Sequence, residues 1–242
     1  MPDLPLTITE IISKTAPVKS KFPIESLLSA RLLLAPRIVG DKVYFLSDFS
    51  GVLSLYSMDK TGGIPQPLLP GAQALVNPHL MIGDNFVVLP KLGKALVMID
   101  KMGNENYQPS FVPLEGGIPE PVLGPDYENQ QIACVHCDVE KDIAYFYHDD
   151  RKNPEQQCLR VNLETSEITS LGRSPHGNFC NGAAPDHSMV ILADGYTAGD
   201  NVLYYWKPGM KQRELLYGIP LEKRGGRQVP PSGIGWCSFV NG

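Results

Sequence analysis

The sequence predicts an all-β protein, a β-propeller made of four-stranded antiparallel sheets, and three observations support this prediction. The chain of 242 residues contains 23 glycines and 22 prolines, and helix interiors tolerate neither residue well. Short runs of β-branched and aromatic residues alternate with turn-forming residues along the chain. Similar segments also recur at intervals of roughly 40–50 residues, the spacing typical of propeller blades.

The clearest repeat is a glycine- and proline-rich motif. Gly-Gly-Ile-Pro-Gln-Pro-Leu-Leu begins at Gly62, and Gly-Gly-Ile-Pro-Glu-Pro-Val-Leu begins at Gly116. In each unit a Pro-containing apolar segment comes first and ends at a Gly-Asp or Pro-Asp turn. An apolar strand, the second of the unit, follows this turn, a Gly-bearing hairpin leads into the next strand, and a short Pro-rich strand ends the unit. Gly-Asp turns suit such hairpins because both residues tolerate a positive φ.

A second pair of segments supports the repeat. Gly-Asp turns end at Asp41 and Asp84, and each precedes an apolar strand. The interval between these two turns is shorter than the interval between the two glycine motifs. We assign the difference to an insertion in residues 101–110. Fainter copies of the unit occupy residues 142–163 and 185–206.

The repeat units define the predicted domains. We expect an N-terminal arm with a short helix in residues 1–30, followed by blades in residues 31–73, 74–124, 125–177 and 178–232, and the start of a fifth blade in residues 233–242. Such a propeller would be incomplete or open. Because a single blade cannot bury its own faces, neighbouring blades must stack. The alternative is an ordinary β-sandwich with accidental internal similarity.

The first unit carries a recognisable set of motifs. Phe-Leu-Ser-Asp ends at Asp48, Leu-Tyr-Ser-Met-Asp ends at Asp59, a Gly pair follows at Gly62, and Pro185-Asp-His repeats the opening turn later in the chain. This combination resembles the WD40-like (PD40) repeat shared by TolB-like propellers and by the propeller domains of prolyl-oligopeptidase-type (family S9) serine peptidases. Residues 22–31 also resemble the lead-in that precedes the propeller in those peptidases.

The resemblance implies a function that this chain alone does not supply. In the S9 peptidases an α/β-hydrolase domain follows the propeller and carries the serine nucleophile, its acid and its histidine, whereas this sequence has no Gly-x-Ser-x-Gly motif. We therefore expect no catalytic residue here, and a non-catalytic propeller that gates peptide access to a hydrolase domain. The alternatives are a stand-alone TolB- or WD40-like scaffold for protein interactions and, more remotely, a metal-dependent enzyme of the lactonase type.

Candidate binding residues come from the predicted innermost strands, whose polar side chains would face a central tunnel. They are His79 in the second unit, His136 in the third and Asn178 in the fourth, with Asn77 and Asn181 beside them. The alternative is that these side chains satisfy backbone groups at the edge of the tunnel.

No metal or other cofactor is expected. Cys134 and Cys137 have CxxC spacing, but no second pair of ligands follows, and on a strand their side chains would point to opposite faces. Burial of these thiols is the favoured interpretation. The acidic residues at the hairpins lack a Ca²⁺-loop pattern and are expected to cap their own turns; they are Asp48, Asp149, Asp150, Asp194 and Asp200.

Charge and hydropathy limit the partners and the location. The formal net charge is −5, which disfavours nucleic acid and anionic membranes as partners. The start of the chain lacks the pattern of a secretory signal, and no apolar stretch reaches the roughly 20 residues that span a bilayer. We expect a cytoplasmic protein whose partner is a hydrolase domain, a peptide substrate or another protein. The basic segment 221–231 is expected to be an exposed loop that could steer an acidic partner.

Overall fold

The computed structural model describes residues 31–71, 73–79, 83–101, 103–197 and 199–225. The chain divides into two compact units, Met1–Leu32 and Leu33–Gly242, and every element below belongs to the second. The predicted N-terminal helix and the predicted start of a fifth blade lie outside the described residues.

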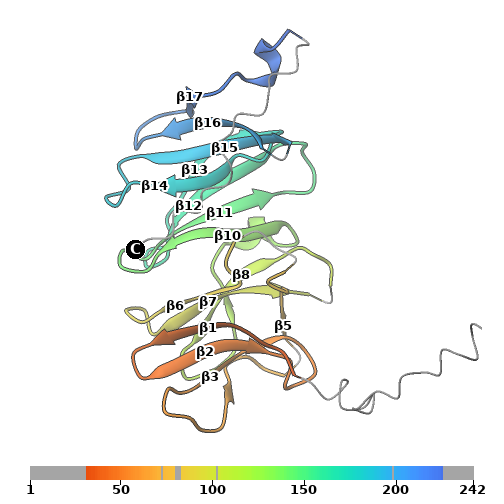
Figure 1. The fold of residues 1–242 in the computed structure, drawn as a ribbon, viewed down its shortest axis with the longest axis vertical. Helices are drawn as coiled ribbons and strands as arrows, with labels where there is room; N and C mark the ends of the chain where they lie inside the picture. The colour runs from red at the N-terminus through yellow and green to blue at the C-terminus, as the bar shows by residue number, and fades with distance from the viewer. Residues whose placement is uncertain (1–30, 72, 80–82, 102, 198, 226–242) are drawn as a thin grey trace, which may run out of the picture. The chain divides into compact units, whose positions relative to one another are not determined.

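Four antiparallel sheets follow one another along the chain (Figure 1). The first contains β1 (Leu33–Val39), β2 (Lys42–Ser47), β3 (Ser54–Asp59) and β4 (Gln66–Pro67). The third contains β10 (Gln131–Asp138), β11 (Ile143–Asp149), β12 (Gln156–Asn162) and β13 (Ile168–Ser174). The fourth contains β14 (Phe179–Ala183), β15 (Val190–Thr197), β16 (Asp200–Trp206) and β17 (Glu214–Tyr217). In each of these three sheets the strands pair in chain order, so the predicted blade architecture is confirmed.

The second sheet differs at its first position. Its strands are β5 (Ala74–Leu75), β6 (Phe86–Leu89), β7 (Lys94–Asp100), β8 (Gln108–Pro113) and β9 (Glu120–Pro121), and both β5 and β6 pair with β7. The only helical turns among the described residues are two short 3-10 segments, Pro125–Tyr127 and Leu221–Lys223. No helix in the described part of the chain is long and apolar enough to cross a membrane.

The strand pairing corrects one prediction about the repeat. The apolar strand after Asp84 was predicted to be the second strand of its blade, but β6 occupies the first position, and β7 is the counterpart of β2. The third strands of the two blades, β3 and β8, begin at the same interval as their fourth strands, β4 and β9. The two glycine motifs are separated by this same interval, so the second halves of the two blades align without a gap. Residues 101–110 are therefore no insertion: they form the β7–β8 hairpin and the start of β8. Apolar runs look alike in the first two strands of a blade, so sequence pattern alone misaligned them.

Apolar side chains fill each space between consecutive sheets. Leu46 and Leu55 of the first sheet pack with Val97 of the second. Two further clusters join the second sheet to the third and the third to the fourth. Side chains alternate between the two faces of β2: Tyr44 and Leu46 face the second sheet, while Phe45 lies in a separate aromatic cluster. Among the described residues no strand of the fourth sheet pairs with the first.

Candidate functional site at the innermost strands

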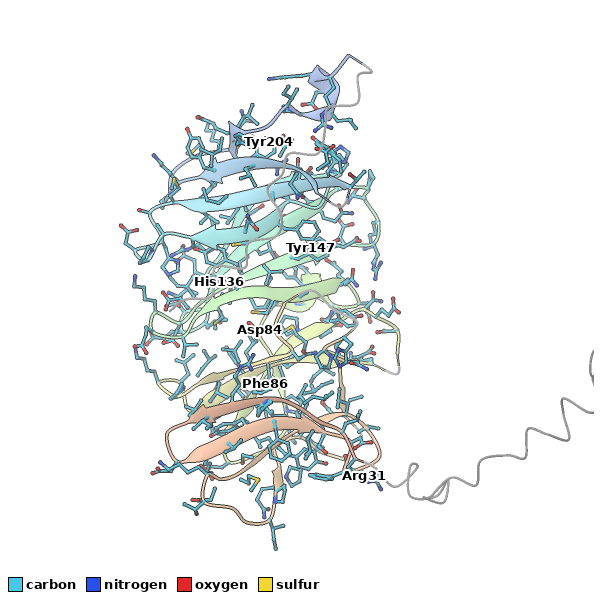
Figure 2. The ribbon with its side chains drawn as sticks, in the orientation of Figure 1. Arg31, Asp84, Phe86, His136, Tyr147 and Tyr204 are labelled. Atoms are coloured by element: carbon cyan, nitrogen blue, oxygen red, sulfur yellow. The ribbon has the colours of Figure 1, made fainter. Side chains whose placement is uncertain are left out.

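The first strands of the sheets carry a row of charged and titratable side chains. In a propeller these strands lie nearest the central axis. Arg37 lies on β1, Asp84 between β5 and β6, and His136 on β10. Figure 2 shows Asp84 and His136 on neighbouring sheets. From the fourth sheet, His187 of the β14–β15 hairpin approaches the same region, because it contacts Tyr145 of β11.

A direct crossing between two sheets positions Asp84. Between β5 and β6 the chain leaves the second sheet, and the Asp84 backbone N–H donates a hydrogen bond of 2.8 Å to the Cys134 carbonyl on β10. The preceding residue must be glycine: Gly83 has φ +96°, and a Cβ there would lie 2.0 Å from the same carbonyl oxygen. The second and third sheets are therefore linked by backbone contact at their first strands.

Asp84 lies between a fixed positive charge and an imidazole. Its carboxylate is 3.9 Å from the Arg37 guanidinium, and the two side chains are 45% and 56% exposed, so the ion pair contributes little stability. Burial raises the pKa of Asp84 against the opposing effects of Arg37 and His136. Burial, with help from His187, lowers the pKa of His136. The pKa values of this acid and this base are therefore closer together than they would be in water.

A hydrogen-bonded chain joins the third sheet to the fourth beside His136. The Tyr145 hydroxyl donates to His187 Nδ1 at 2.8 Å, and His187 Nε2 donates to Asp138 at 3.0 Å. The ring of Tyr145 also stacks between the two imidazoles, at centroid distances of 5.9 Å to His136 and 5.8 Å to His187. Since the Asp138 carboxylate can only accept, neutral His187 carries its proton on Nε2.

This network has the connectivity of a general base but lacks a reactive nucleophile. The group that His187 would activate is the phenol of Tyr145, which is fully buried, and burial raises the pKa of that phenol. Burial also acts to raise the pKa of Asp138, but hydrogen bonds from His187 and from two backbone N–H groups outweigh it and lower that pKa. In the described part of the chain no serine or cysteine side chain hydrogen-bonds to an imidazole. The hydrogen bonds of the network join the third sheet to the fourth.

The structure does not bring the three predicted binding residues together. His136 lies in the row described above. His79 is exposed in the turn after β5, where its backbone N–H bonds to the Asn77 side chain at 3.0 Å. Asn178 is fully buried before β14, donates to the Gly172 carbonyl and accepts from Arg213, each at 2.6 Å. The bond from Asn178 to the Gly172 carbonyl matches the alternative interpretation, in which these side chains satisfy backbone groups.

Two of the hairpin aspartates do not cap their own turns as predicted. Asp149 and Asp150 do accept bonds from backbone N–H groups of the next residues. Asp194, in contrast, forms a two-pronged ion pair with Arg213 at 2.5–2.6 Å, and Asp200 forms one with Arg224 at 2.6–2.9 Å. The arginines are 19 and 24 residues away in the sequence, so local turn chemistry could not reveal these pairs.

The basic segment is exposed as predicted at residues 221–223 and 225. Arg224 is the exception, because its side chain is 6% exposed; residues beyond 225 lie outside the described part. No group of three or more His, Cys, Asp or Glu side chains among the described residues could hold a metal ion.

Sequence reasoning missed the hydrogen-bonded chain at His187. Its three members come from β10, β11 and the β14–β15 hairpin, and no spacing in the sequence links Asp138, Tyr145 and His187. The only available signal was the Pro185-Asp-His turn, which was interpreted as a blade opening. The turn does form, since the His187 backbone N–H bonds to the Ala184 carbonyl at 2.8 Å, and it delivers the imidazole to the third sheet.

Comparison with known proteins shows similarity in fold. No protein-family model matches the sequence, and a search of curated proteins finds no relative. The structure is similar to Pyrococcus horikoshii acylaminoacyl peptidase, with a TM-score of 0.54 and 10% identity over 81% of this chain and 34% of that chain. A puromycin hydrolase gives a TM-score of 0.52 and 16% identity over 77% and 32%. TolB from Acinetobacter baumannii gives 0.49 and 13% over 72% and 40%.

This chain thus spans about a third of the length of the two hydrolases. The similarity to these two proteins concerns the fold alone, and it agrees with the propeller architecture predicted from the sequence.

Proposed function

We propose that this chain is the non-catalytic propeller portion of an S9-type serine peptidase and that it gates the access of peptides to a hydrolase domain outside the sequence given. The observation that carries the proposal is the partial match to two hydrolases. Most of this chain aligns with about a third of each hydrolase, at TM-scores above 0.5. The sequence contains no Gly-x-Ser-x-Gly motif of its own.

The gate would act by size and by surface charge. Stacked blades have rigid cores, so a passage along their first strands would admit an extended peptide more readily than a folded domain. Arg37 on β1 and Asp84 between β5 and β6 are half exposed and offer one positive and one negative group to a peptide backbone or terminus. Neither group needs to react, because the filter is steric and electrostatic.

Labelling with a serine-reactive fluorophosphonate tests the link to a hydrolase. The recombinant chain should form no adduct. An antibody against the chain should precipitate, from native extract, a labelled hydrolase that is either the same polypeptide or a tightly bound partner. A native precipitate without any labelled serine hydrolase would contradict the proposal, and so would an adduct on the recombinant chain itself.

The scaffold function remains the alternative. It would gain support if the native precipitate contained one stoichiometric partner that lacks hydrolase sequence. The exposed apolar side chains at the end of the fourth sheet, between residues 215 and 221, are the observation that favours an interaction surface.

A further inference from the structure

Two free thiols meet where the third sheet packs on the fourth. Cys158 lies on β12 and Cys180 on β14. Both side chains belong to the apolar cluster that fills the space between these two sheets. Cys158 is fully buried, whereas Cys180 is partly exposed. One thiol of the pair is therefore within reach of a small reagent, and the other lies directly behind it.

Strand pairing turns both side chains towards the same interface. Within the third sheet Cys158 lies opposite Tyr147 of β11, and within the fourth sheet Cys180 lies opposite Leu192 of β15. Residues opposite each other on paired strands have their side chains on the same face of the sheet. Leu192 packs in the cluster between the sheets, and the Tyr147 ring stacks on Phe179 of β14 at a centroid distance of 5.1 Å. The faces that carry the two cysteines are thus turned towards each other.

The two cysteines also interact directly. Cys180 forms hydrogen bonds with the Cys158 sulfur through its backbone and through its own thiol. A disulfide forms only between cysteines whose side chains already approach each other, because its geometry allows little variation. The stacking of the third and fourth sheets meets this requirement for Cys158 and Cys180, although no spacing in the sequence links them.

We infer that Cys158 and Cys180 are a site of reversible oxidation, at which a low-molecular-weight disulfide such as oxidised glutathione converts the two thiols into a disulfide between the third and fourth sheets. The inference is independent of the proposed function, because it depends only on the contact between β12 and β14. Both residues are free thiols in the structure, which is therefore the reduced form.

The reaction consists of two exchange steps. The Cys180 thiol first loses its proton to solvent, and its sulfur attacks one sulfur of the reagent; the reagent's S–S bond breaks, and the thiolate that leaves takes up a proton. The Cys158 thiol then loses its proton, and its sulfur attacks the Cys180 sulfur of the mixed disulfide, which releases the second small thiol. Both protein thiols are oxidised, and the reagent disulfide is reduced to two thiols.

The second step should be the slower one. Burial raises the pKa of the Cys158 thiol, so the thiolate that must attack is scarce at neutral pH. A mixed disulfide on Cys180 should therefore appear before the bond between the sheets closes. Because Cys180 is partly exposed, a reducing thiol can reach the finished disulfide from the same side and reverse the reaction.

The disulfide would hold two neighbouring blades together. It joins the third strand of one sheet to the first strand of the next, in the cluster that also contains Tyr145, the hydrogen-bond partner of His187. A cross-link restricts the unfolded chain and thereby stabilises the folded one. The oxidised chain should unfold at a higher urea concentration than the reduced chain, and dithiothreitol should reverse this shift.

Peptide mapping of the whole chain without reduction tests the inference. The reduced chain is incubated with oxidised glutathione, the remaining thiols are blocked with N-ethylmaleimide, and the monomer is digested with trypsin. Cleavage after lysine and arginine places Cys158 in residues 153–160 and Cys180 in residues 174–211, while Cys134 and Cys137 share residues 102–141. Mass spectrometry should find 153–160 joined to 174–211 as the main linked product, and dithiothreitol should separate them.

Serine variants separate the two steps. Cys158→Ser should stop at a glutathione mixed disulfide on Cys180, and Cys180→Ser should leave Cys158 reduced. Cys137→Ser is the matched control: it removes a thiol of β10 that is outside the pair, and its yield of the linked peptides should equal that of the wild type.

Three results would overturn the inference. The first is a folded wild type that forms no link between 153–160 and 174–211, or that links Cys134, Cys137 or Cys237 instead. The second is the same distribution of pairings in the folded chain and in urea, because the fold is what brings Cys158 and Cys180 together. The third is an oxidised chain that unfolds at the same urea concentration as the reduced chain, because the disulfide would then not hold the blades together.

Discussion

Gly83→Ala tests the backbone link that positions Asp84. A Cβ at this position would lie 2.0 Å from the Cys134 carbonyl oxygen and 2.8 Å from its carbon, and a backbone carbonyl cannot rotate out of the way as a side chain can. The positive φ of +96° costs a non-glycine residue on the order of 1 kcal/mol or more. Loss of the hydrogen bond to Cys134 adds about 0.5–1.5 kcal/mol. We therefore expect a destabilisation of about 2–4 kcal/mol.

Gly93→Ala supplies the control for backbone strain. Gly93 has φ +64°, and a Cβ there would meet nothing within 4 Å, so this substitution should cost only about 1 kcal/mol. Urea unfolding of both variants, analysed at a common m-value, gives the difference between their free energies of unfolding. If the two variants were destabilised equally, the close approach of the second and third sheets would be refuted.

Four further outcomes follow from polar side chains of the third and fourth sheets. Tyr145→Phe removes the donor to His187 and should cost about 1–3 kcal/mol in urea unfolding; an unchanged midpoint would contradict the network. Arg213→Met leaves Asp194 buried without its partner and should cost about 3–5 kcal/mol, and adding Asp194→Asn should recover part of that loss. The pKa of Asp138 is lowered on folding, so its stabilisation is present at neutral pH and is lost as the pH falls below about 4; Asp138→Asn should flatten this part of the stability profile. Burial raises the pKa of Cys137 to about 12, so iodoacetamide at mildly alkaline pH should modify Cys137 in the folded chain far more slowly than in urea, as mass spectrometry can measure.

The sequence was sufficient for the architecture because local patterns encode it. Alternation of side chains along β2 specifies a strand. The copied motifs at Gly62 and Gly116 specify turns and a repeat. Each of these features depends on residues that are close together in the sequence. The alignment of the first two repeat units failed at Asp84, because the Gly-Asp pair there does not close a hairpin. Asp84 instead pairs with Cys134 on the next sheet. These two residues are far apart in the sequence, so no local pattern predicts their contact.

The candidate site was predicted only in part for the same reason. The position of His136 on the first strand of the third sheet was predicted, because strands are readable from sequence. Its neighbours Asp84 and His187 reach it from other sheets, and Asn178 accepts a hydrogen bond from Arg213, which lies 35 residues later. The way the sheets stack determines which side chains meet between them. A single sequence does not show how the sheets stack, so it does not show these contacts.

The dependence of cleavage on substrate size tests the proposed gating function most directly. The measurement is kcat/KM of the hydrolase that the proposal expects an antibody against this chain to isolate, on peptides of increasing length and on a folded protein that contains the same cleavage sequence. A filtering propeller predicts efficient cleavage of short peptides and a steep fall towards long and folded substrates. Equal kcat/KM for the short peptide and for the folded protein would contradict it.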